Sequence, residues 1–221
     1  MTGEPSVPSA RAALRRPGKI VCVGRNYRDH AKELGNDVPA QPLLFLKPPS
    51  SVVRAGAPVV LPTASVRVEF EGEIGVVVGA QLTRAGEDEA RHALRGVVAL
   101  NDVTARDLQR SDGQWTRAKG FDTFCPIGVE RPLAGDVGAL EVVTLLNGVE
   151  RQRGSASDMV FGVPFLLSYI SHIMTLEPGD VVATGTPAGV GPLVAGDVVE
   201  VLVLLGGEPL SQVANPVIAP V

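Results

Sequence analysis

Cysteines and aromatic residues are scarce in this 221-residue chain, which has two cysteines, one tryptophan and 4% aromatic residues in total. The cysteines, Cys22 and Cys125, lie in apolar stretches and form no C-x-x-C pair. Two such residues cannot supply a disulfide framework, so we expect a reducing compartment and a cytoplasmic protein.

An excess of positive charge and a long apolar run are also missing. The formal net charge is −4, so there is no basic excess of the kind that binds nucleic acid, and no nucleic-acid partner is expected. No apolar run approaches the roughly 18 residues of a transmembrane helix, so no membrane partner is expected either. The composition that remains, 45% hydrophobic and 20% charged, is that of a globular protein with a substantial core.

The first 18 residues differ from the rest of the chain. They contain three arginines, one glutamate and three prolines, and they lack the apolar core of a secretory signal. A mitochondrial presequence is one interpretation, and a flexible N-terminal tail is the favoured one. We therefore expect a tail over residues 1–18 and a single domain over residues 19–221.

Short β-branched runs separated by turn residues predict more strands than helices. The pair Asn147-Gly148 predicts a hairpin, because it supplies the two positive φ angles of a type I′ turn. Residues 110–123 are polar, which favours a long functional loop, and Thr104 is expected to cap a short helix. Strands and helices do not alternate regularly, which predicts an α+β fold. The expected strands are 19–23, 43–46, 58–61, 68–79, 96–103, 140–146, 149–153, 181–184 and 197–205, and the expected helices are 25–34, 87–94 and 163–174.

Three carboxylates alternate along one predicted strand, at Glu69, Glu71 and Glu73. Residues two apart in a strand share a face at about 6.6 Å, where two unit charges repel by roughly 2.5 kcal/mol at an effective dielectric near 20. Protonation, arginines or a hard divalent cation could relieve this repulsion. If the strand ending at Asp102 is a neighbour, Glu71, Glu73 and Asp102 supply three oxygen ligands for Mg²⁺ or Mn²⁺. The ordinary alternative is an exposed, charged strand face.

His30 and Glu33 are three residues apart on a predicted helix, so their side chains can touch. A carboxylate that holds one imidazole nitrogen fixes the tautomer and makes the other nitrogen a better base. From spacing alone, a surface histidine beside a surface glutamate is the more common outcome. His92 and His172 have no matching partner and are expected to be structural.

The glycine-rich stretch over residues 185–191 lacks the Lys-Ser/Thr ending of a P-loop and the G-x-G-x-x-G spacing, so it is not predicted to bind a nucleotide. We interpret it as a backbone clamp, in which the Thr186 hydroxyl and nearby amides face a substrate carboxylate.

Taken in order, seven stretches resemble the fumarylacetoacetate hydrolase family, specifically its short acylpyruvase branch. The resemblance covers nearly the whole chain from Lys19 onward. It implies a mixed β-sandwich roll of the family's C-terminal domain type, with short peripheral helices, and a homodimer. The stretches are V-G-R-N-Y at 23–27 with His30 and Glu33, F-L-K-P at 45–48, E-G-E at 71–73, N-D-V-T-A-R-D at 101–107, W-T-R-A-K at 115–119, N-G at 147–148, and G-T-P-A-G-V-G at 185–191.

The resemblance also assigns roles at the site. It places Mg²⁺ or Mn²⁺ on Glu71, Glu73 and Asp102, and leaves Glu69 to form a salt bridge or face solvent. It implies that His30 with Glu33 activates water and that the Lys119 ammonium stabilises an enolate or oxyanion. The implied contacts to a 2-keto acid substrate come from Arg25, Lys47 and Arg106, with Gln109 fixing the catalytic water or the substrate.

These roles imply a divalent-metal-dependent hydrolase that cleaves a carbon–carbon bond in acylpyruvates and also has the means to decarboxylate oxaloacetate. Both reactions pass through a pyruvate enolate, so fold and metal site do not separate them. Two alternatives stay open. One is an isomerase or decarboxylase acting on a 2-hydroxy-dienoate, and the other is a catalytically silent metal-binding module.

Overall fold

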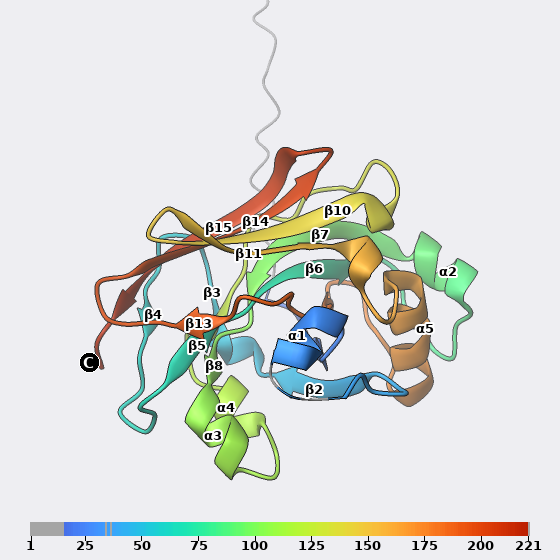
Figure 1. Cartoon of the computed structure of the whole chain (residues 1–221). Helices are drawn as coiled ribbons and strands as arrows, with labels where there is room; N and C mark the ends of the chain where they lie inside the picture. The colour runs from blue at the N-terminus through green and yellow to red at the C-terminus, as the bar shows by residue number, and fades with distance from the viewer. Residues whose placement is uncertain (1–15, 34, 36, 221) are drawn as a thin grey trace, which may run out of the picture.

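The computed structural model describes residues 16–33, 35 and 37–220 of the chain. Residues 1–15 of the expected tail lie outside the described residues. Two five-stranded sheets pack against each other, with short helices at the edges (Figure 1). This arrangement confirms the α+β prediction. No helix among the described residues is long and apolar enough to cross a membrane.

The first sheet has at one of its ends the buried carboxylates described below. Its strand order is β2-β1-β12-β6-β7, and every pairing is antiparallel except the parallel pair β1–β12. All seven residues of the interior strand β6 are buried, which explains its continuous valine-rich sequence. The strands are β1 (Ile20–Gly24), β2 (Leu43–Lys47), β6 (Gly72–Val78), β7 (Leu94–Asn101) and β12 (Val181–Ala183).

The second sheet forms the other layer, with the order β11-β10-β14-β15-β4. Its β10–β11 hairpin turns at Asn147 and Gly148, whose φ angles are 53° and 78°, as the sequence predicts. The strands are β4 (Val59–Val60), β10 (Leu140–Leu146), β11 (Val149–Ser155), β14 (Val198–Leu205) and β15 (Glu208–Ile218). Two small sheets, β13-β5-β8 and β3-β9, complete the set with β3 (Val52–Val53), β5 (Val68–Phe70), β8 (Thr104–Ala105), β9 (Cys125–Pro126) and β13 (Gly191–Pro192).

The helices are short and peripheral. α1 and α3–α4 lie at the end of the first sheet where the carboxylates gather, and α2 and α5 pack together at the opposite end (Figure 1). The helices are α1 (Arg28–Glu33), α2 (Glu87–His92), α3 (Arg106–Ser111), α4 (Thr116–Lys119) and α5 (Val163–Ile173), with 3-10 turns at Pro49–Ser51, Val137–Ala139 and Ala156–Asp158.

The main hydrophobic core lies between the two sheets. Ile74 and Val76 of β6 meet Val142 of β10 and Val201 of β14 there, and α5 adds residues such as Leu166. Each of these side chains is fully or almost fully buried, and such burial is worth about 1.5–3 kcal/mol per side chain. The core therefore fixes the strands whose ends carry the polar residues described below.

The expected single acidic strand over residues 68–79 is wrong in one respect. The chain forms two strands, β5 and β6, and Glu71 lies between them. β5 leaves the first sheet and pairs with β8 and β13, so the period-two rule does not carry across the break. Glu69 therefore does not share a continuous face with Glu73.

Two further expectations need correction, and one strand was not expected. Thr104 is not a helix cap, because it lies in β8 and its hydroxyl donates to the Asp102 carbonyl at 2.8 Å. The expected loop over residues 110–123 contains α4. Strand β15 was not predicted, because Pro209 and Pro216 interrupt its alternating pattern. The Gly206-Gly207 turn before it, with φ angles of 61° and 84°, was the signal that could have identified it.

Candidate active site

Three buried carboxylates meet at one end of the first sheet. The antiparallel register of β6 and β7 pairs Gly72 with Asn101, and this register brings Glu71 and Glu73 next to Asp102. Each of the three offers one oxygen that lies within 4.8 Å of the oxygens of the other two. Ligand oxygens around a small octahedral cation are separated by about 3.0–4.2 Å, given bonds near 2.1 Å. The residues present therefore fit a hard divalent cation such as Mg²⁺ or Mn²⁺.

Gly72 lies between Glu71 and Glu73, and both its N–H and its carbonyl form hydrogen bonds to side chains. Its N–H donates to Gln152 Oε1 at 2.9 Å, and its carbonyl accepts from the Thr186 hydroxyl at 2.8 Å. Gln152 Nε2 in turn donates to Thr186 Oγ1 at 2.8 Å, which closes the ring of hydrogen bonds. This ring sets the backbone from which Glu71 and Glu73 project.

Two lysines and one arginine bond the buried carboxylates. Lys119 Nζ lies 2.9 Å from Glu71 and 2.6 Å from Asp102. Lys47 Nζ lies 2.7 Å from the other oxygen of Asp102. Arg106 bridges Glu71 and Glu69 at 2.7 Å each, so Glu69 forms a salt bridge, one of the two outcomes that the family resemblance implies.

The environment shifts the pKa values of Glu71 and Glu73 in opposite directions. Burial alone would raise the pKa of Glu71, but Lys119 and Arg106 hold it well below its usual range. Burial raises the pKa of Glu73, and the charges of Asp102 and Glu71 raise it further. Glu73 accepts a hydrogen bond from the Gly185 amide at 2.8 Å but has no ion-pair partner among the described residues. Electrostatic repulsion in the site is thus concentrated on Glu73, the position that gains most from a cation.

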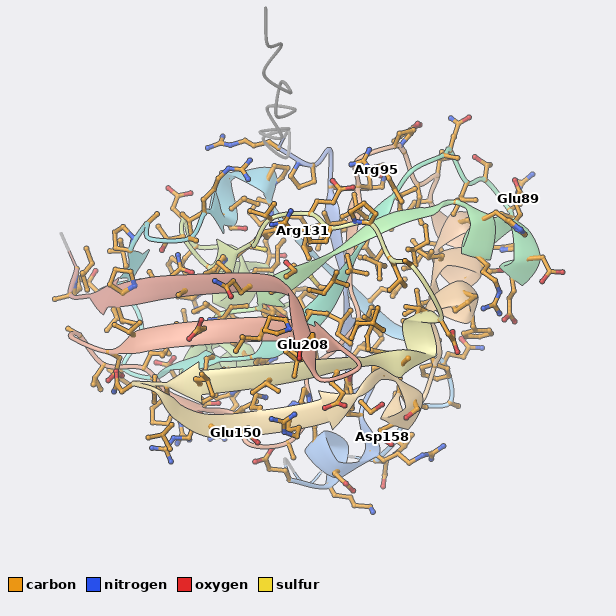
Figure 2. All side chains as sticks on the ribbon, turned by 90° about the horizontal axis from the view of Figure 1, so that it is seen from above. Glu89, Arg95, Arg131, Glu150, Asp158 and Glu208 are labelled. Carbon is orange, nitrogen blue, oxygen red and sulfur yellow. The ribbon has the colours of Figure 1, made fainter. Side chains whose placement is uncertain are left out.

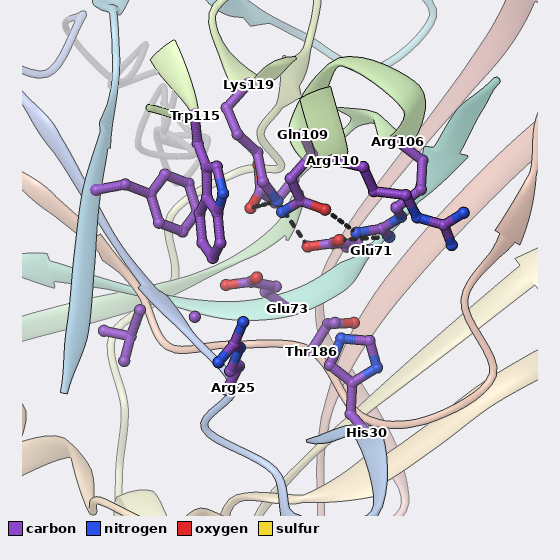
Figure 3. A pocket seen from close by; sticks show the side chains of 14 residues that line it. Arg25, His30, Glu71, Glu73, Arg106, Gln109, Arg110, Trp115, Lys119 and Thr186 are labelled. Atoms are coloured by element: carbon purple, nitrogen blue, oxygen red, sulfur yellow. Dashed lines mark hydrogen bonds and ion pairs between the residues drawn. The ribbon is translucent and has the colours of Figure 1, made fainter. Parts of the chain in front are cut away.

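Lys119 is held as an ammonium ion. Burial would lower its pKa, but Asp102 and Glu71 raise it above the ordinary value. The Phe45 ring centroid lies 4.9 Å from Lys119 Nζ, and Phe45 meets Trp115 edge to face at 5.3 Å. Both rings line the pocket, and Figure 3 shows Trp115 beside Lys119 on one side of it.

His30 and Glu33 form a pair on α1. His30 Nδ1 lies 3.1 Å from Glu33 Oε2, and only 5% of the His30 surface is exposed. The Gly189 amide donates to both oxygens of Glu33, at 3.0 and 3.2 Å. Because Nδ1 is engaged, Nε2 is the nitrogen left to exchange a proton. His92 and His172 instead bond backbone carbonyls four residues earlier, as expected of structural histidines.

A pocket of about 270 Å³ brings most of the expected residues together (Figure 3). Glu33 and Lys47 are not among its lining residues and reach it through His30 and Asp102. Arg110, Trp115 and Phe45 line it but were not among the predicted site residues. The only available signal for Arg110 was its position four residues after Arg106 on the same helix face. The expected residues that line the pocket are Arg25, His30, Glu71, Glu73, Asp102, Arg106, Gln109, Lys119 and Thr186.

The glycine-rich loop acts on the protein's own carboxylates. Gly185 and Gly189 donate their amides to Glu73 and Glu33, and the Thr186 hydroxyl donates its proton to Gly72. These groups are therefore not free to clamp a substrate carboxylate in this arrangement. Their effect is to join the carboxylate triad to the His30–Glu33 pair through one loop.

Fold and site together define an enzyme-like centre in which buried carboxylates, a protonated lysine and a histidine face one pocket. Residues 19–218 match the fumarylacetoacetate (FAA) hydrolase C-terminal family, and the chain belongs to that family. The mitochondrial oxaloacetate tautomerase of Arabidopsis thaliana is 47% identical over 184 residues, covering 80% of this chain and 82% of that protein. The mitochondrial oxaloacetate decarboxylase of Dictyostelium discoideum is 42% identical, covering 82% and 87%.

A solved structure agrees with this assignment. The fumarylpyruvate hydrolase of Pseudomonas aeruginosa, in complex with Mn²⁺ and pyruvate, superposes with a TM-score of 0.82 at 31% identity. The match covers 92% of this chain and 90% of that one. These three proteins are thus named as a tautomerase and a decarboxylase of oxaloacetate and as a hydrolase of fumarylpyruvate.

Proposed function

We propose that the chain is a divalent-cation-dependent enzyme that forms a pyruvate-type enolate from a 3-substituted 2-oxo acid, with oxaloacetate as the leading substrate. The observation that carries the proposal is the convergence of the Glu71–Glu73–Asp102 triad, Lys119 and the His30–Glu33 pair on one pocket. The names of the Arabidopsis and Dictyostelium relatives support the choice of oxaloacetate.

Glu71, Glu73 and Asp102 would hold Mg²⁺ or Mn²⁺, which when bound supplies Lewis acidity and orients the 2-oxo acid. The chain's own groups do the rest. The Lys119 ammonium stabilises negative charge that develops on the 2-oxo oxygen as the enolate forms. His30, with Nδ1 held by Glu33, exchanges a proton with C3 of the substrate through Nε2. Tautomerisation of the keto form removes one proton from C3 and adds one proton to the 2-oxo oxygen. The reverse reaction moves one proton each way between the same two atoms, so the number of protons on the site does not change.

Hydrolysis of acylpyruvates is the second candidate, and the buried His30–Glu33 pair favours it. There His30 takes a proton from water, and the resulting hydroxide attacks the distal carbonyl. The C3–C4 bond breaks, the acyl group leaves as a carboxylic acid, and the bonding electrons form the pyruvate enolate, which is then protonated at C3. The fumarylpyruvate hydrolase named above lends support at 31% identity.

One panel tests both candidates. Oxaloacetate tautomerisation and decarboxylation are measured beside hydrolysis of acetylpyruvate and fumarylpyruvate, each with Mg²⁺, with Mn²⁺ and with a chelator. We expect turnover that needs the cation and fails in Glu71→Gln. A chain that binds the cation at the triad but turns over none of these compounds would be the silent module instead.

Assembly and location complete the proposal. The family resemblance supports a homodimer, and the scarcity of cysteine supports a cytoplasmic location. Sedimentation velocity at several concentrations tests the first: a species of a single 23.0 kDa chain at all concentrations would contradict it.

A further inference from the structure

Two arginines of the pocket have no partner among the residues that the structure describes. Arg25 and Arg110 both line the pocket, and no hydrogen bond or ion pair engages either guanidinium among the described residues. Arg106, one helical turn before Arg110, is by contrast fully engaged with Glu69, Glu71 and Gln109. The pocket therefore presents two fork-shaped donors with nothing to bind.

The two arginines enter the pocket from different elements. Arg25 follows β1 with a φ of 58°, the left-handed region that a residue with a β-carbon rarely adopts, and such strain is typical of functional positions. Arg110 lies on α3 and is exposed at the pocket mouth. Figure 3 shows Arg25 on the Glu73 side of the pocket and Arg110, with Arg106, on the Glu71 side.

The charge of the site is already balanced without them. The cluster holds four carboxylates and four cations, so their formal charges cancel although Glu73 itself forms no ion pair, and Arg25 and Arg110 are surplus. A divalent cation on the triad would add further positive charge, and an anion with a single charge could not offset all of it. The four carboxylates are Glu69, Glu71, Glu73 and Asp102, and the four cations are Arg67, Arg106, Lys47 and Lys119.

We propose that Arg110 selects 2-oxo dicarboxylates by binding the carboxylate farthest from the 2-oxo group. In this arrangement the 2-oxo acid end lies at the triad beside Arg25, and the second carboxylate meets the Arg110 fork at the mouth. A planar guanidinium matches a carboxylate with two parallel hydrogen bonds, which gives selectivity as well as affinity. The inference rests on the proposed function and names the substrate class for the same site.

Matched substrates isolate this contact in steady-state assays. Oxaloacetate and its 4-methyl ester differ only at the distal carboxylate, which the methyl group leaves uncharged. Tautomerisation is the activity compared, because the ester cannot lose C4 as CO2. For Arg110→Met we expect kcat/KM to fall roughly 10- to 100-fold with oxaloacetate and about twofold or less with the ester. Arg110→Lys, which keeps the charge but loses the fork, should recover part of the loss.

Arg117→Met is the control variant. Arg117 lies on the neighbouring helix α4, is exposed, bonds Asp112 and is not among the pocket residues. Its removal changes the net charge by the same amount without touching the pocket, so it should leave the preference for oxaloacetate over the ester unchanged.

A binding measurement separates this inference from the proposed function. Calorimetry in Mg²⁺ compares 2-oxoglutarate with 2-oxopentanoate, two five-carbon acids that differ at the distal end. Wild type should bind 2-oxoglutarate at least about tenfold more tightly, and Arg110→Met should lose that difference. If this holds while no 2-oxo acid is turned over, the proposed function fails and the Arg110 subsite stands. If wild type shows no preference, or if Arg110→Met weakens both members of each pair equally, Arg110 is not the selector.

Discussion

A β-carbon placed on Gly72 would lie 1.9 Å from Thr144 Oγ1, so strand β10 packs directly against the residue between Glu71 and Glu73. No side chain fits at this position unless Thr144 or the backbone moves. The E-G-E spacing of the sequence is therefore a packing requirement as well as a chemical one. The second sheet reaches through Thr144 and Gln152 to the point from which the triad projects.

Gly72→Ala should destabilise the protein and disturb the triad together. Overpacking of a tight interior site costs about 1–3 kcal/mol, and here the strain falls on the Gly72 peptide that Gln152 and Thr186 bond. Urea denaturation would show the loss of unfolding free energy, and Mn²⁺ titration would show weaker binding.

Gly86→Ala is the matched control for this substitution. Gly86 precedes α2 at a φ of −75°, and nothing lies within 4 Å of an added β-carbon. Its unfolding free energy and Mn²⁺ affinity should stay close to those of wild type. Equal behaviour of the two variants would show that the Gly72–Thr144 contact does not constrain the site.

The opposite pKa shifts of Glu71 and Glu73 predict opposite stability effects in chelator. At neutral pH the ionised Glu71 is stabilised by Lys119 and Arg106, so Glu71→Gln leaves buried cations underpaired and should cost about 3–5 kcal/mol. Ionised Glu73 is opposed by burial, Asp102 and Glu71, so Glu73→Gln should raise the unfolding free energy by about 1–3 kcal/mol.

In Mg²⁺ we expect wild type to have a higher unfolding free energy than Glu73→Gln, the reverse of the order in chelator. Wild type gains stability by binding the ion, about 2.7 kcal/mol at a concentration of one hundred times Kd, whereas a variant that has lost a ligand gains less. Differential scanning calorimetry in chelator and in Mg²⁺ measures the stability of each variant without and with the ion. A Glu73→Gln protein that is less stable than wild type in chelator would contradict the assignment of the repulsion to Glu73.

His30→Ala should lower kcat roughly 10²- to 10⁴-fold while leaving metal affinity within about twofold, because the proposed role of His30 is proton exchange and it is not a predicted metal ligand. Glu33→Gln should lose less, since the imidazole remains and only its orientation and polarisation change. His92→Ala, on exposed α2, is the control and should match wild type. Equal rates in His30→Ala and His92→Ala would remove His30 from the mechanism.

The sequence was informative where chemistry depends on short spacing. Glu71, Glu73 and Asp102 could be joined because two neighbouring strands end in carboxylates, and the β6–β7 register brings them together. The helical i, i+3 relation allowed a contact between His30 and Glu33, but spacing alone favoured a plain surface pair, and the family resemblance gave the pair its role. Local periodicity thus sets the His30–Glu33 contact, whereas the triad also needs the strand register.

The remaining site residues depend on long-range packing, which spacing does not encode. Lys47 and Asp102 are 55 residues apart, and the lysine lies behind the carboxylate rather than in the pocket. The loop bond from Gly189 to Glu33 spans 156 residues. Arg110 and Trp115 line the pocket because α3 and α4 fold over the sheet end, and a polar stretch alone does not reveal that arrangement.

The buried thiols predict a pH dependence of stability that is independent of catalysis. Burial raises the pKa of Cys125 to about 12 and that of Cys22 well above its ordinary value, with Asp102 and Glu73 adding to the effect on Cys22. An unfolded thiol titrates near 8.5, so between about pH 8.5 and 12 the unfolded chain releases protons that the native protein retains. Unfolding free energy should therefore fall as pH rises through this window, by up to about 1.4 kcal/mol per pH unit for each thiol. Below about pH 8.5 the thiols should have no effect on it.

Urea denaturation from pH 7 to 10 measures the slope of unfolding free energy against pH. Cys22→Ala and Cys125→Ala combined should give a shallower slope, and parallel curves for variant and wild type would show that the thiols do not carry it.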